Sequence, residues 1–466
     1  MITQRSALRL GFAAAALAAS TVVLAQGAFK DLSTTAGGFQ TWDSDLINIE
    51  AVTQTGKGVY VAVLDTGMVP NWRDYFPEAR IATNLGAGFY QPVSFKAKAD
   101  ECGLGIEVGK LQKSTWVGSR GSTHGTHVSS TILGYFYRSN ADAAAGFTLP
   151  PIVIRGIAPD VTVIPVRVLA DYQVPALPQC GPGYAGGNAV FGTSAMIAAG
   201  IRYATDLKRA GYSPMVINMS LGGSALEDIE NEAIDYAISN GVIVVAAAGN
   251  EGETGMSYPG AYAPVISAGS VGWTGEWLYP GSGPRYRMWW LQDSAPSLLT
   301  PPLVAGSGNV AEPTAASDIY VSDFSSRALP GQQLDVLAPG SWVRGPFAGD
   351  PGYNHLPWWS KGIGDLVGGN AGNFYYVGGT SMATPHVASV AALMLEKNPN
   401  LTQSQVESIL RTTAITLPPS GSREVYDFSD WATIAWDTDC GGELCDAVGA
   451  GAMQADLAVA ATPPTP

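Results

Sequence analysis

Four short apolar runs, rich in β-branched residues and bounded by Gly, Pro, Asp or Asn, constrain the fold of this chain most. They are Val59–Leu64, Val161–Val168, Met215–Asn218 and Val242–Ala246. Runs of this length that do not alternate with polar residues are typical of strands buried on both faces of a parallel sheet. The chain is therefore expected to contain such a sheet.

Helical patterns lie between and after these runs. Thr193–Ala210 and Asp228–Ser239 both carry apolar residues at helical spacing and both end at glycine-containing stops. Ser381–Leu395 is small and apolar almost throughout, as expected of a helix inside a core, and Thr402–Gln405 has the sequence of a capping box. Strands that alternate with helices predict an α/β fold, with a largely parallel central sheet flanked by helices.

The N-terminus has the layout of a secretory signal peptide. Arg5 and Arg9 precede an apolar run, 11–25, that ends in small residues. This run is short for a membrane span, with an uncleaved anchor or a buried helix as the alternative. A chain cut after Ala25 is expected to be secreted or periplasmic, with no membrane span. Losing two arginines takes the net charge from −14 to −16, which gives no electrostatic basis for binding nucleic acid.

The four cysteines, Cys102, Cys180, Cys440 and Cys445, fit an exported protein. An even number indicates two disulfides, for which three pairings are open. The short spacing of Cys440 and Cys445 favours a local bridge, which leaves Cys102 for Cys180. A zinc site is the alternative, but there is no C-x-x-C spacing and no histidine near any of the four.

No linker separates one core from another. We expect a signal peptide at 1–25, a short N-terminal segment at 26–50 and one body at 51–460, with insertions near 88–118, 272–322 and 343–378. The last two insertions are rich in Trp, Tyr, Gly and Pro, including Trp289-Trp290 and Trp358-Trp359. They are predicted to be long ordered loops, which either shape a binding cleft or pack on the body as surface segments.

Asp65 directly follows the first apolar run, within Val-Leu-Asp-Thr-Gly. Functional groups of open parallel sheets gather beyond the carboxyl ends of the strands, so this position suits chemistry. Taken alone, the aspartate is better explained as a structural residue, either an N-cap or a turn aspartate. An aspartic protease is a further alternative, but it needs a second Asp-Thr-Gly or Asp-Ser-Gly to share a proton, and the chain has none.

The chain has four histidines, His124, His127, His355 and His386. His124 opens an apolar, helix-like stretch and is the candidate general base, because an unperturbed pKa near ~6.5 lets histidine exchange a proton near neutral pH. His127 and His386 are expected to be buried structural residues. A metal site at His124 and His127 is disfavoured by the absence of His-Glu-x-x-His.

Three further segments could carry chemistry. Ser381 follows Gly378-Gly-Thr and begins a helix, where the helix dipole favours negative charge, although such a serine is ordinarily an N-cap. Asn250 follows the fourth run and could donate its amide to an oxyanion, although Gly-Asn alone is a turn signal. An exposed backbone edge that can bind an extended peptide is formed by Ser220, Leu221, Gly222 and Gly223.

In this order the motifs resemble those of the subtilisin-like serine proteases (subtilases). The matching segments are Val-Leu-Asp65-Thr-Gly, His124-Gly-Thr-His-Val, Met-Ser220-Leu-Gly-Gly, Ala-Ala-Gly-Asn250 and Gly-Thr-Ser381-Met-Ala-Thr-Pro-His-Val-Ala. The resemblance covers roughly 56–453, with the insertions outside it. It implies a three-layer subtilisin-like fold and a monomeric serine endopeptidase that hydrolyses peptide bonds in protein or peptide substrates, with no cofactor required for the chemistry.

The resemblance also implies a role for each residue. Ser381 would attack the scissile carbonyl, His124 would take its proton and pass it to the leaving amine, and Asp65 would orient the imidazole. Asn250 would donate its side-chain amide to the oxyanion, together with the backbone N–H of Ser381. The edge at 220–223 would pair with the substrate.

Two departures from the family bear on maturation and metal binding. Family members often have a folding propeptide of about eighty residues, whereas about thirty residues separate Ala25 from Gly56. Gln40–Ala51 already resembles the mature N-terminal segment of the family. Asp74 stands where the family often has a calcium ligand, so a structural calcium ion is compatible with the resemblance, although its other ligands cannot be matched.

Two other functions are alternatives to a serine endopeptidase. A serine-carboxyl peptidase shares the scaffold, but it would have Glu in place of His124 and Asp in place of Asn250. A catalytically inactive scaffold that binds partners through its aromatic insertions is disfavoured because every member of the triad is present.

Overall fold

The computed structural model describes residues 41–97, 104–137, 152–177, 180–181, 186–275, 315–347, 374–427, 430–440 and 444–465. The predicted signal peptide lies outside these residues. So do Cys102, His355, both Trp-Trp pairs and most of the two aromatic insertions.

A nine-stranded sheet forms the centre of the molecule, in the order β14-β13-β12-β11-β1-β8-β2-β5, with β15 also pairing with β13. Only β5 and β14 run antiparallel to their neighbours. The predicted parallel sheet is confirmed, and all four apolar runs are strands in it. The strands are β1 (Tyr60–Asp65), β2 (Ala87–Tyr90), β5 (Gln112–Ser114), β8 (Thr162–Arg167), β11 (Met215–Met219), β12 (Ile243–Ala247), β13 (Ile266–Trp273), β14 (Ile319–Val321) and β15 (Val336–Pro339).

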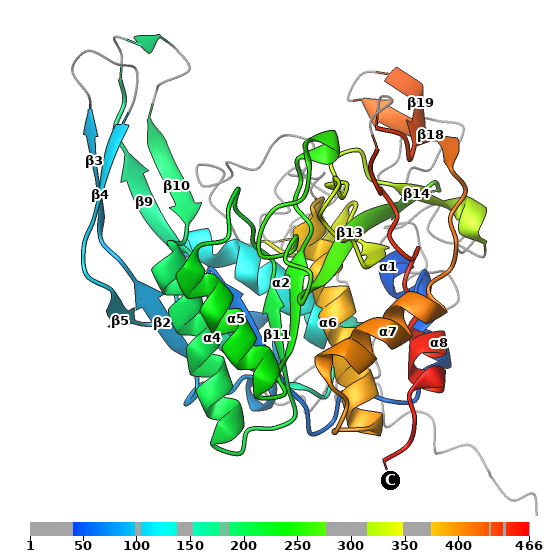
Figure 1. Ribbon diagram of the computed structural model, residues 1–466, viewed down its shortest axis with the longest axis horizontal. Coiled ribbons are helices and arrows are strands. Elements are labelled where there is room, and N and C mark those ends of the chain that lie inside the picture. Colours follow the sequence, from blue (N-terminus) through cyan, green and yellow to red (C-terminus); the bar gives the residue numbers. More distant parts are fainter. Residues whose placement is uncertain are drawn as a thin grey trace, which may run out of the picture.

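Helices cover both faces of this sheet (Figure 1). Val61 and Val63 of β1 point into the core that contains α2 and α6, while Ala62 and Leu64 point into the core that contains α4 and α5. Successive side chains of a strand point to opposite faces, so a strand covered on both sides must be apolar throughout. The helices are α1 (Trp42–Asp45), α2 (Thr123–Leu133), α4 (Ser194–Arg209), α5 (Asp228–Ser239), α6 (Thr380–Lys397), α7 (Gln403–Thr413) and α8 (Ala455–Ala461).

Capping hydrogen bonds mark the starts of α4 and α7, as the sequence predicted. The hydroxyl of Thr193 accepts the N–H of Met196 at 3.3 Å at the start of α4. The predicted capping box of α7 is present, because the Thr402 hydroxyl accepts the Gln405 N–H at 3.3 Å and the Gln405 side chain accepts the Thr402 N–H at 2.9 Å. Local capping chemistry therefore fixes both helix starts.

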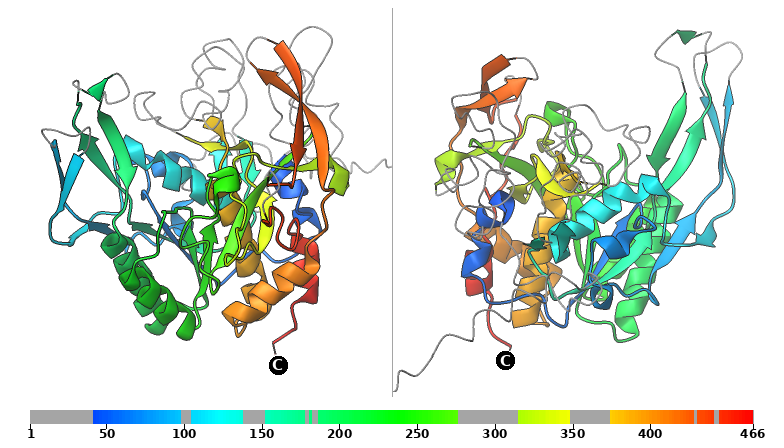
Figure 2. Two further views of the ribbon diagram at one scale, coloured as in Figure 1. Left: turned by 45° about the horizontal axis from the view of Figure 1, so that its top comes forward. Right: turned by 180° about the vertical axis from the view of Figure 1, so that it is seen from behind.

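Two pairs of strands that lie outside the central sheet stand together at one end of the molecule (Figures 1 and 2). They are β3 (Val93–Ala97) with β4 (Leu104–Val108), and β9 (Ala170–Val174) with β10 (Gly187–Phe191). The rings of Phe95 and Phe191 join the two hairpins at 6.4 Å, and Tyr172 stacks on Phe191 at 4.3 Å. The predicted insertion at 88–118 thus holds one hairpin and also carries β5 to the edge of the central sheet. The hairpin β9–β10 was not predicted.

The remaining strands of the described residues form three further antiparallel pairs. They are β6 (Gly134–Tyr137) with β7 (Ile152–Arg155), β16 (Val343–Pro346) with β17 (Phe374–Val377), and β18 (Ser420–Asp427) with β19 (Asp430–Asp437). The last of these stands at the end of the molecule opposite β9–β10 (Figures 1 and 2).

The N-terminal segment packs on α6 at both ends of that helix. Trp42 and Ile47 are buried, and Asp43 contacts His386 in the first half of α6. Near the other end, one oxygen of Glu396 accepts the backbone N–H groups of Thr55, Gly56 and Lys57 at 2.7, 2.6 and 3.2 Å. Residues 41–57 are therefore an integral part of the packed body.

The predicted disulfide between Cys440 and Cys445 is confirmed. Cys180 is also disulfide-bonded, while Cys102, its predicted partner, is outside the described residues. Across the described ranges, none of the helices combines the length and the apolar character needed to cross a bilayer.

Candidate active site

Asp65 is the last residue of β1 and is completely buried. Its Oδ1 accepts the backbone N–H of Thr66 at 2.6 Å, and Oδ1 and Oδ2 lie 2.8 and 3.0 Å from Nδ1 of His124. An ionised carboxylate can only accept, so Nδ1 carries the proton and Nε2 faces away from Asp65. This fixes both the tautomer and the orientation of the ring.

His124 lies in the first turn of α2, which the residue after Asp65 holds in place. The hydroxyl of Ser122 donates to the carbonyl of Thr66 at 2.6 Å, and the N–H of Gly125 donates to the Thr66 hydroxyl at 2.9 Å. A Cβ at Gly125 would lie 2.4 Å from the carbonyl oxygen of Gly67. Glycine therefore lets the helix approach the end of β1 closely enough for the imidazole to meet Asp65.

The surroundings of His124 change its proton affinity. Burial lowers the pKa of the imidazole, but the charge of Asp65 and its hydrogen bond raise that pKa, and the net result is a raised pKa. The side chain remains 21% exposed, so solvent and ligand can reach it. A ring of this kind can accept a proton at near-neutral pH and hold it while facing a carboxylate.

Ser381 lies in the first turn of α6 and exchanges two hydrogen bonds with Ser220, just past the end of β11. The Ser381 hydroxyl donates to the Ser220 carbonyl at 3.2 Å, and the Ser220 hydroxyl donates to the Ser381 carbonyl at 2.8 Å. Pro385 has no N–H for the Ser381 carbonyl, which the fourth following residue would otherwise satisfy in a helix. The Ser220 hydroxyl takes over that bond.

The structure thus brings Asp65 and His124 together, while Ser381 is paired with Ser220. Among the described residues, the Ser381 hydroxyl makes no hydrogen bond to His124. In enzymes generally, the hydrogen bond between a nucleophile and its base is often long or poorly aligned before substrate binds and tightens when it does.

Asn250 follows the carboxyl end of β12, and its side chain has a fixed direction. Its Oδ1 accepts the backbone N–H of Thr380 at 2.8 Å and the Thr380 hydroxyl at 3.1 Å. A backbone N–H can only donate, so the oxygen of the amide must face Thr380. The NH₂ group of the Asn250 side chain is therefore available to donate to another acceptor. The side chain that carries it is bound to Thr380, the residue before Ser381.

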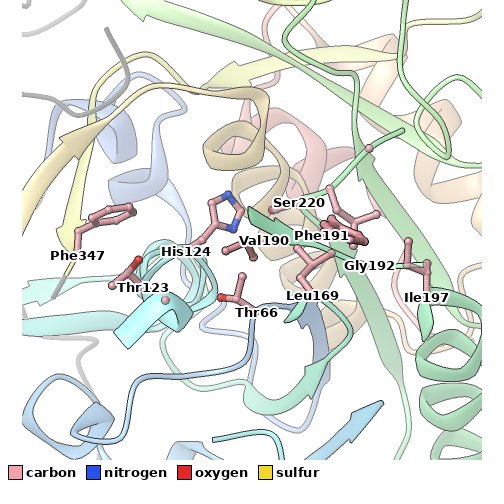
Figure 3. Close-up of a pocket in the computed structure, with 13 residues that line it drawn as sticks. Thr66, Thr123, His124, Leu169, Val190, Phe191, Gly192, Ile197, Ser220 and Phe347 are labelled. Carbon is pink, nitrogen blue, oxygen red and sulfur yellow. The ribbon is translucent and has the colours of Figure 1, made fainter. Parts of the chain in front are cut away.

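A pocket of about 390 Å³ lies beside His124 (Figure 3). Its walls come from the loops around His124, the end of β11, the hairpin β9–β10 and the start of α4. Most of the larger side chains are apolar, so the pocket suits an apolar group of a ligand. It is lined by Thr66, Gly121, Thr123, His124, Leu169, Val190, Phe191, Gly192, Ile197, Ser220, Leu221, Gly222 and Phe347.

The predicted peptide-binding edge is partly used by the chain itself. Both backbone groups of Gly223 are paired with Tyr258 at 2.8 Å. Ser220, Leu221 and Gly222 line the pocket and are the part of the predicted edge that faces it.

Sequence comparison decides the family. The model of the subtilase family matches residues 56–446, which is most of the chain. The protein belongs to the subtilase family.

Individual relatives agree with this assignment. Fervidolysin of Fervidobacterium pennivorans is 27% identical over 389 residues, which cover 83% of this chain and 40% of that protein. Subtilisin DY of Bacillus licheniformis is 27% identical over 376 residues, which cover 80% and 89% of the two chains. The chain thus spans less than half of fervidolysin and most of subtilisin DY.

A solved structure supports the fold. The crystal structure of fervidolysin, described as a keratinolytic enzyme related to subtilisin, has a TM-score of 0.50 at 22% identity, and the match covers 94% of this chain and 48% of that one. The predicted three-layer subtilisin-like fold is confirmed.

The two other histidines that the structure describes, His127 and His386, lie inside the body of this subtilase. His127 is completely buried and its Nε2 lies 3.1 Å from the carbonyl oxygen of Val343. His386 is also completely buried, with Nδ1 2.8 Å from the Met382 carbonyl and Nε2 3.1 Å from Oδ2 of Asp43. Both were predicted to be structural, and their burial is confirmed. The pairing with Asp43 had no signal in the sequence, because the two residues are 343 positions apart.

The described part of this subtilase offers no cluster of three or more His, Cys, Asp or Glu residues able to hold a metal ion. Asp74, which the resemblance placed at a calcium ligand position, is exposed, and its Oδ2 accepts the side-chain N–H of Asn71 at 2.9 Å. Calcium also takes backbone carbonyl and amide oxygens as ligands, so a structural calcium ion at Asp74 stays a prediction.

Proposed function

We propose that this subtilase is a serine endopeptidase that hydrolyses peptide bonds in protein or peptide substrates. The observation that carries the proposal is the buried carboxylate of Asp65, 2.8 and 3.0 Å from Nδ1 of His124, at the same edge of the sheet as Ser381 and Asn250. These groups are a nucleophile, a base, an orienting carboxylate and an amide donor, which together suffice for acyl transfer. The chemistry therefore needs no cofactor.

The hydrogen bonds of Ser381 suggest how substrate starts the reaction. An extended peptide that pairs with the edge at Ser220 would donate a backbone N–H to the Ser220 carbonyl, which now accepts the Ser381 hydroxyl at 3.2 Å. The displaced hydroxyl would then turn to Nε2 of His124. His124 accepts the proton as Oγ attacks the scissile carbonyl, and returns it to the leaving amine, while Asp65 stabilises the imidazolium.

Asn250 and the start of α6 would stabilise the tetrahedral intermediate. The NH₂ group of Asn250 and the backbone N–H of Ser381 can both donate to the oxyanion, and the positive end of the α6 dipole acts in the same direction. Losing one such side-chain donor costs about 2.7–4 kcal/mol of transition-state stabilisation, a range known for subtilisin itself.

We infer that the chain is exported and loses residues 1–25. The support is the charge and apolar pattern of this segment and the cysteines that form a disulfide at Cys440 and Cys445, which persists in oxidising compartments. Mass spectrometry of the N-terminus of the exported protein tests the cleavage after Ala25. An intact Met1 would contradict it.

Labelling with a fluorophosphonate, which reacts with an activated serine, tests the hydrolase proposal. We expect the wild-type protein to be labelled and Ser381→Ala to remain unlabelled. The matched control is Ser389→Ala, two turns further along α6. Ser389 is buried and, within the described residues, its hydroxyl has no hydrogen-bond partner, so its removal should leave labelling unchanged. Labelling that persists in folded Ser381→Ala would overturn the proposal.

The raised pKa of His124 predicts the pH dependence. A protonated imidazole cannot accept the Ser381 proton, so activity is lost as pH falls through that pKa. We expect kcat/KM for a chromogenic peptide, measured from about pH 5 to pH 9, to follow a single ionisation above the ordinary value of about 6.5. If the kcat/KM profile had its midpoint below about 6.5, burial would lower the pKa of His124 more than Asp65 raises it, which would contradict this prediction.

A further inference from the structure

Glu251, the residue after Asn250, gathers hydrogen bonds from three separate segments on one oxygen. Its Oε2 accepts the backbone N–H of Asn250 at 2.7 Å, the hydroxyl of Ser257 at 3.0 Å and the hydroxyl of Ser326 at 2.9 Å. Hydrogen bonds to an ionised carboxylate are roughly twice as strong as neutral ones. One carboxylate therefore joins the loop after β12 to two neighbouring loops.

The backbone around Glu251 is tied to the same neighbours. The N–H of Glu251 donates to the Ser326 hydroxyl at 3.0 Å, and the N–H of Ser326 donates to the carbonyl of Gly249 at 3.0 Å. A Cβ at Gly249 would lie 2.3 Å from Oε2 of Glu251 and 2.7 Å from the hydroxyls of Ser257 and Ser326. The carboxylate and the two hydroxyls thus pack directly against the Gly249–Asn250 peptide.

Asn250 is consequently held from two sides. Thr380 holds the oxygen of its side chain, and Glu251 holds its backbone N–H. The contact with Thr380 determines the orientation of the Asn250 side-chain amide. The contact with Glu251 determines the position of the Asn250 backbone. We propose that Glu251 is a positioning residue, whose carboxylate fixes the Asn250 peptide so that the Asn250 amide meets the oxyanion. This inference rests on the function proposed above.

A different role for Glu251 would have a different kinetic signature. Part of the residue is exposed, and a carboxylate that contacts substrate would change KM. A group that acts only by orienting an oxyanion donor changes kcat, because that donor binds charge that develops in the transition state.

The first part of the test compares single variants. Glu251→Ala should lower kcat about tenfold, since misplacement of a catalytic group by 1 Å can cost about a hundredfold, and KM should stay within about twofold. Glu251→Gln should recover part of kcat, because its amide oxygen can still accept, though more weakly. The matched control is Glu253→Ala, which removes a neighbouring carboxylate that contacts only Arg327 among the described side chains, at 3.3 Å. It should keep wild-type kcat.

The second part is a double-mutant cycle with Asn250. Asn250→Ala should itself lower kcat by about 10²–10³, and adding Glu251→Ala should then change kcat by less than about twofold, because Glu251 acts through Asn250. Additive losses, or a change confined to KM, would overturn the positioning role while leaving the proposed function intact. A wild-type protein without Ser381-dependent hydrolysis would overturn both.

A readout independent of activity completes the test. In the Ser381→Ala protein, Glu251→Ala should speed amide hydrogen exchange in the 249–252 segment and leave α4 and α5 unchanged. Unaltered exchange at 249–252 would show that the carboxylate does not hold this peptide and would contradict the proposal.

Discussion

Replacing Asp65 with asparagine is expected to lower kcat about ten-thousandfold, although the side chain keeps its size. The carboxylate now accepts from Nδ1 of His124 at 2.8 and 3.0 Å and from the Thr66 N–H at 2.6 Å. Asparagine keeps one acceptor, which the Thr66 N–H occupies, and turns an NH₂ group toward the imidazole. The ring then holds its proton on Nε2 and cannot take one from Ser381.

Asp74→Asn is the matched control, because it makes the same change at an exposed aspartate whose Oδ2 contacts Asn71. Its kcat should equal that of the wild type. Steady-state kinetics on a peptide substrate measure both variants, and circular dichroism checks that Asp65→Asn is folded. A folded Asp65→Asn protein with kcat within about tenfold of the wild type would contradict the orienting role.

Replacing Asp43 with alanine is expected to lower the free energy of unfolding by about 1–3 kcal/mol, the cost of leaving a buried polar group without its hydrogen-bond partner. His386 is completely buried, and its two ring nitrogens face the Met382 carbonyl and the Asp43 carboxylate. Alanine would leave Nε2 without a partner inside the core.

Asp43→Asn separates the loss of charge from the loss of the contact. A neutral imidazole can donate from Nδ1 to Met382 and accept the asparagine NH₂ at Nε2, so this variant should lose much less stability than alanine. Urea unfolding of both variants in the Ser381→Ala background, where self-digestion is removed, measures the difference. Equal losses for Asp43→Asn and Asp43→Ala, or no loss for alanine, would contradict this account.

The parts of this fold that follow from sequence are those governed by local rules. A strand covered on both faces must be apolar throughout, so β1, β8, β11 and β12 are visible as uninterrupted runs. Capping residues mark the starts of α4 and α7 because their side chains bond to the adjacent turn. The positions of Asp65 and Asn250 also follow, since Asp65 comes directly after such a run, Asn250 comes a few residues after another, and parallel strands end at one edge.

The parts that sequence does not reveal depend on contacts between distant segments. The pairing of Ser381 with Ser220 arises because Pro385 leaves a carbonyl free, and only the fold shows which hydroxyl satisfies it. The hairpin β9–β10 supplies Val190 and Phe191 to the pocket, yet apolar residues in a loop-like segment carry no motif. The contact of Asp43 with His386 is invisible for the same reason.

The contacts of residues 41–57 with α6 also bear on when the protein becomes active during its synthesis. The Thr55–Lys57 backbone meets Glu396, and Asp43 meets His386, across separations of 339–343 residues. At about 5–20 residues per second, a ribosome needs tens of seconds to pass from one partner to the other. During that interval the chain lacks Ser381, the proposed nucleophile, so under the proposed mechanism an emerging chain could not cut its neighbours or itself. Under the same mechanism, hydrolysis would begin only after α6, which carries Ser381, has been made and has folded onto residues 41–57.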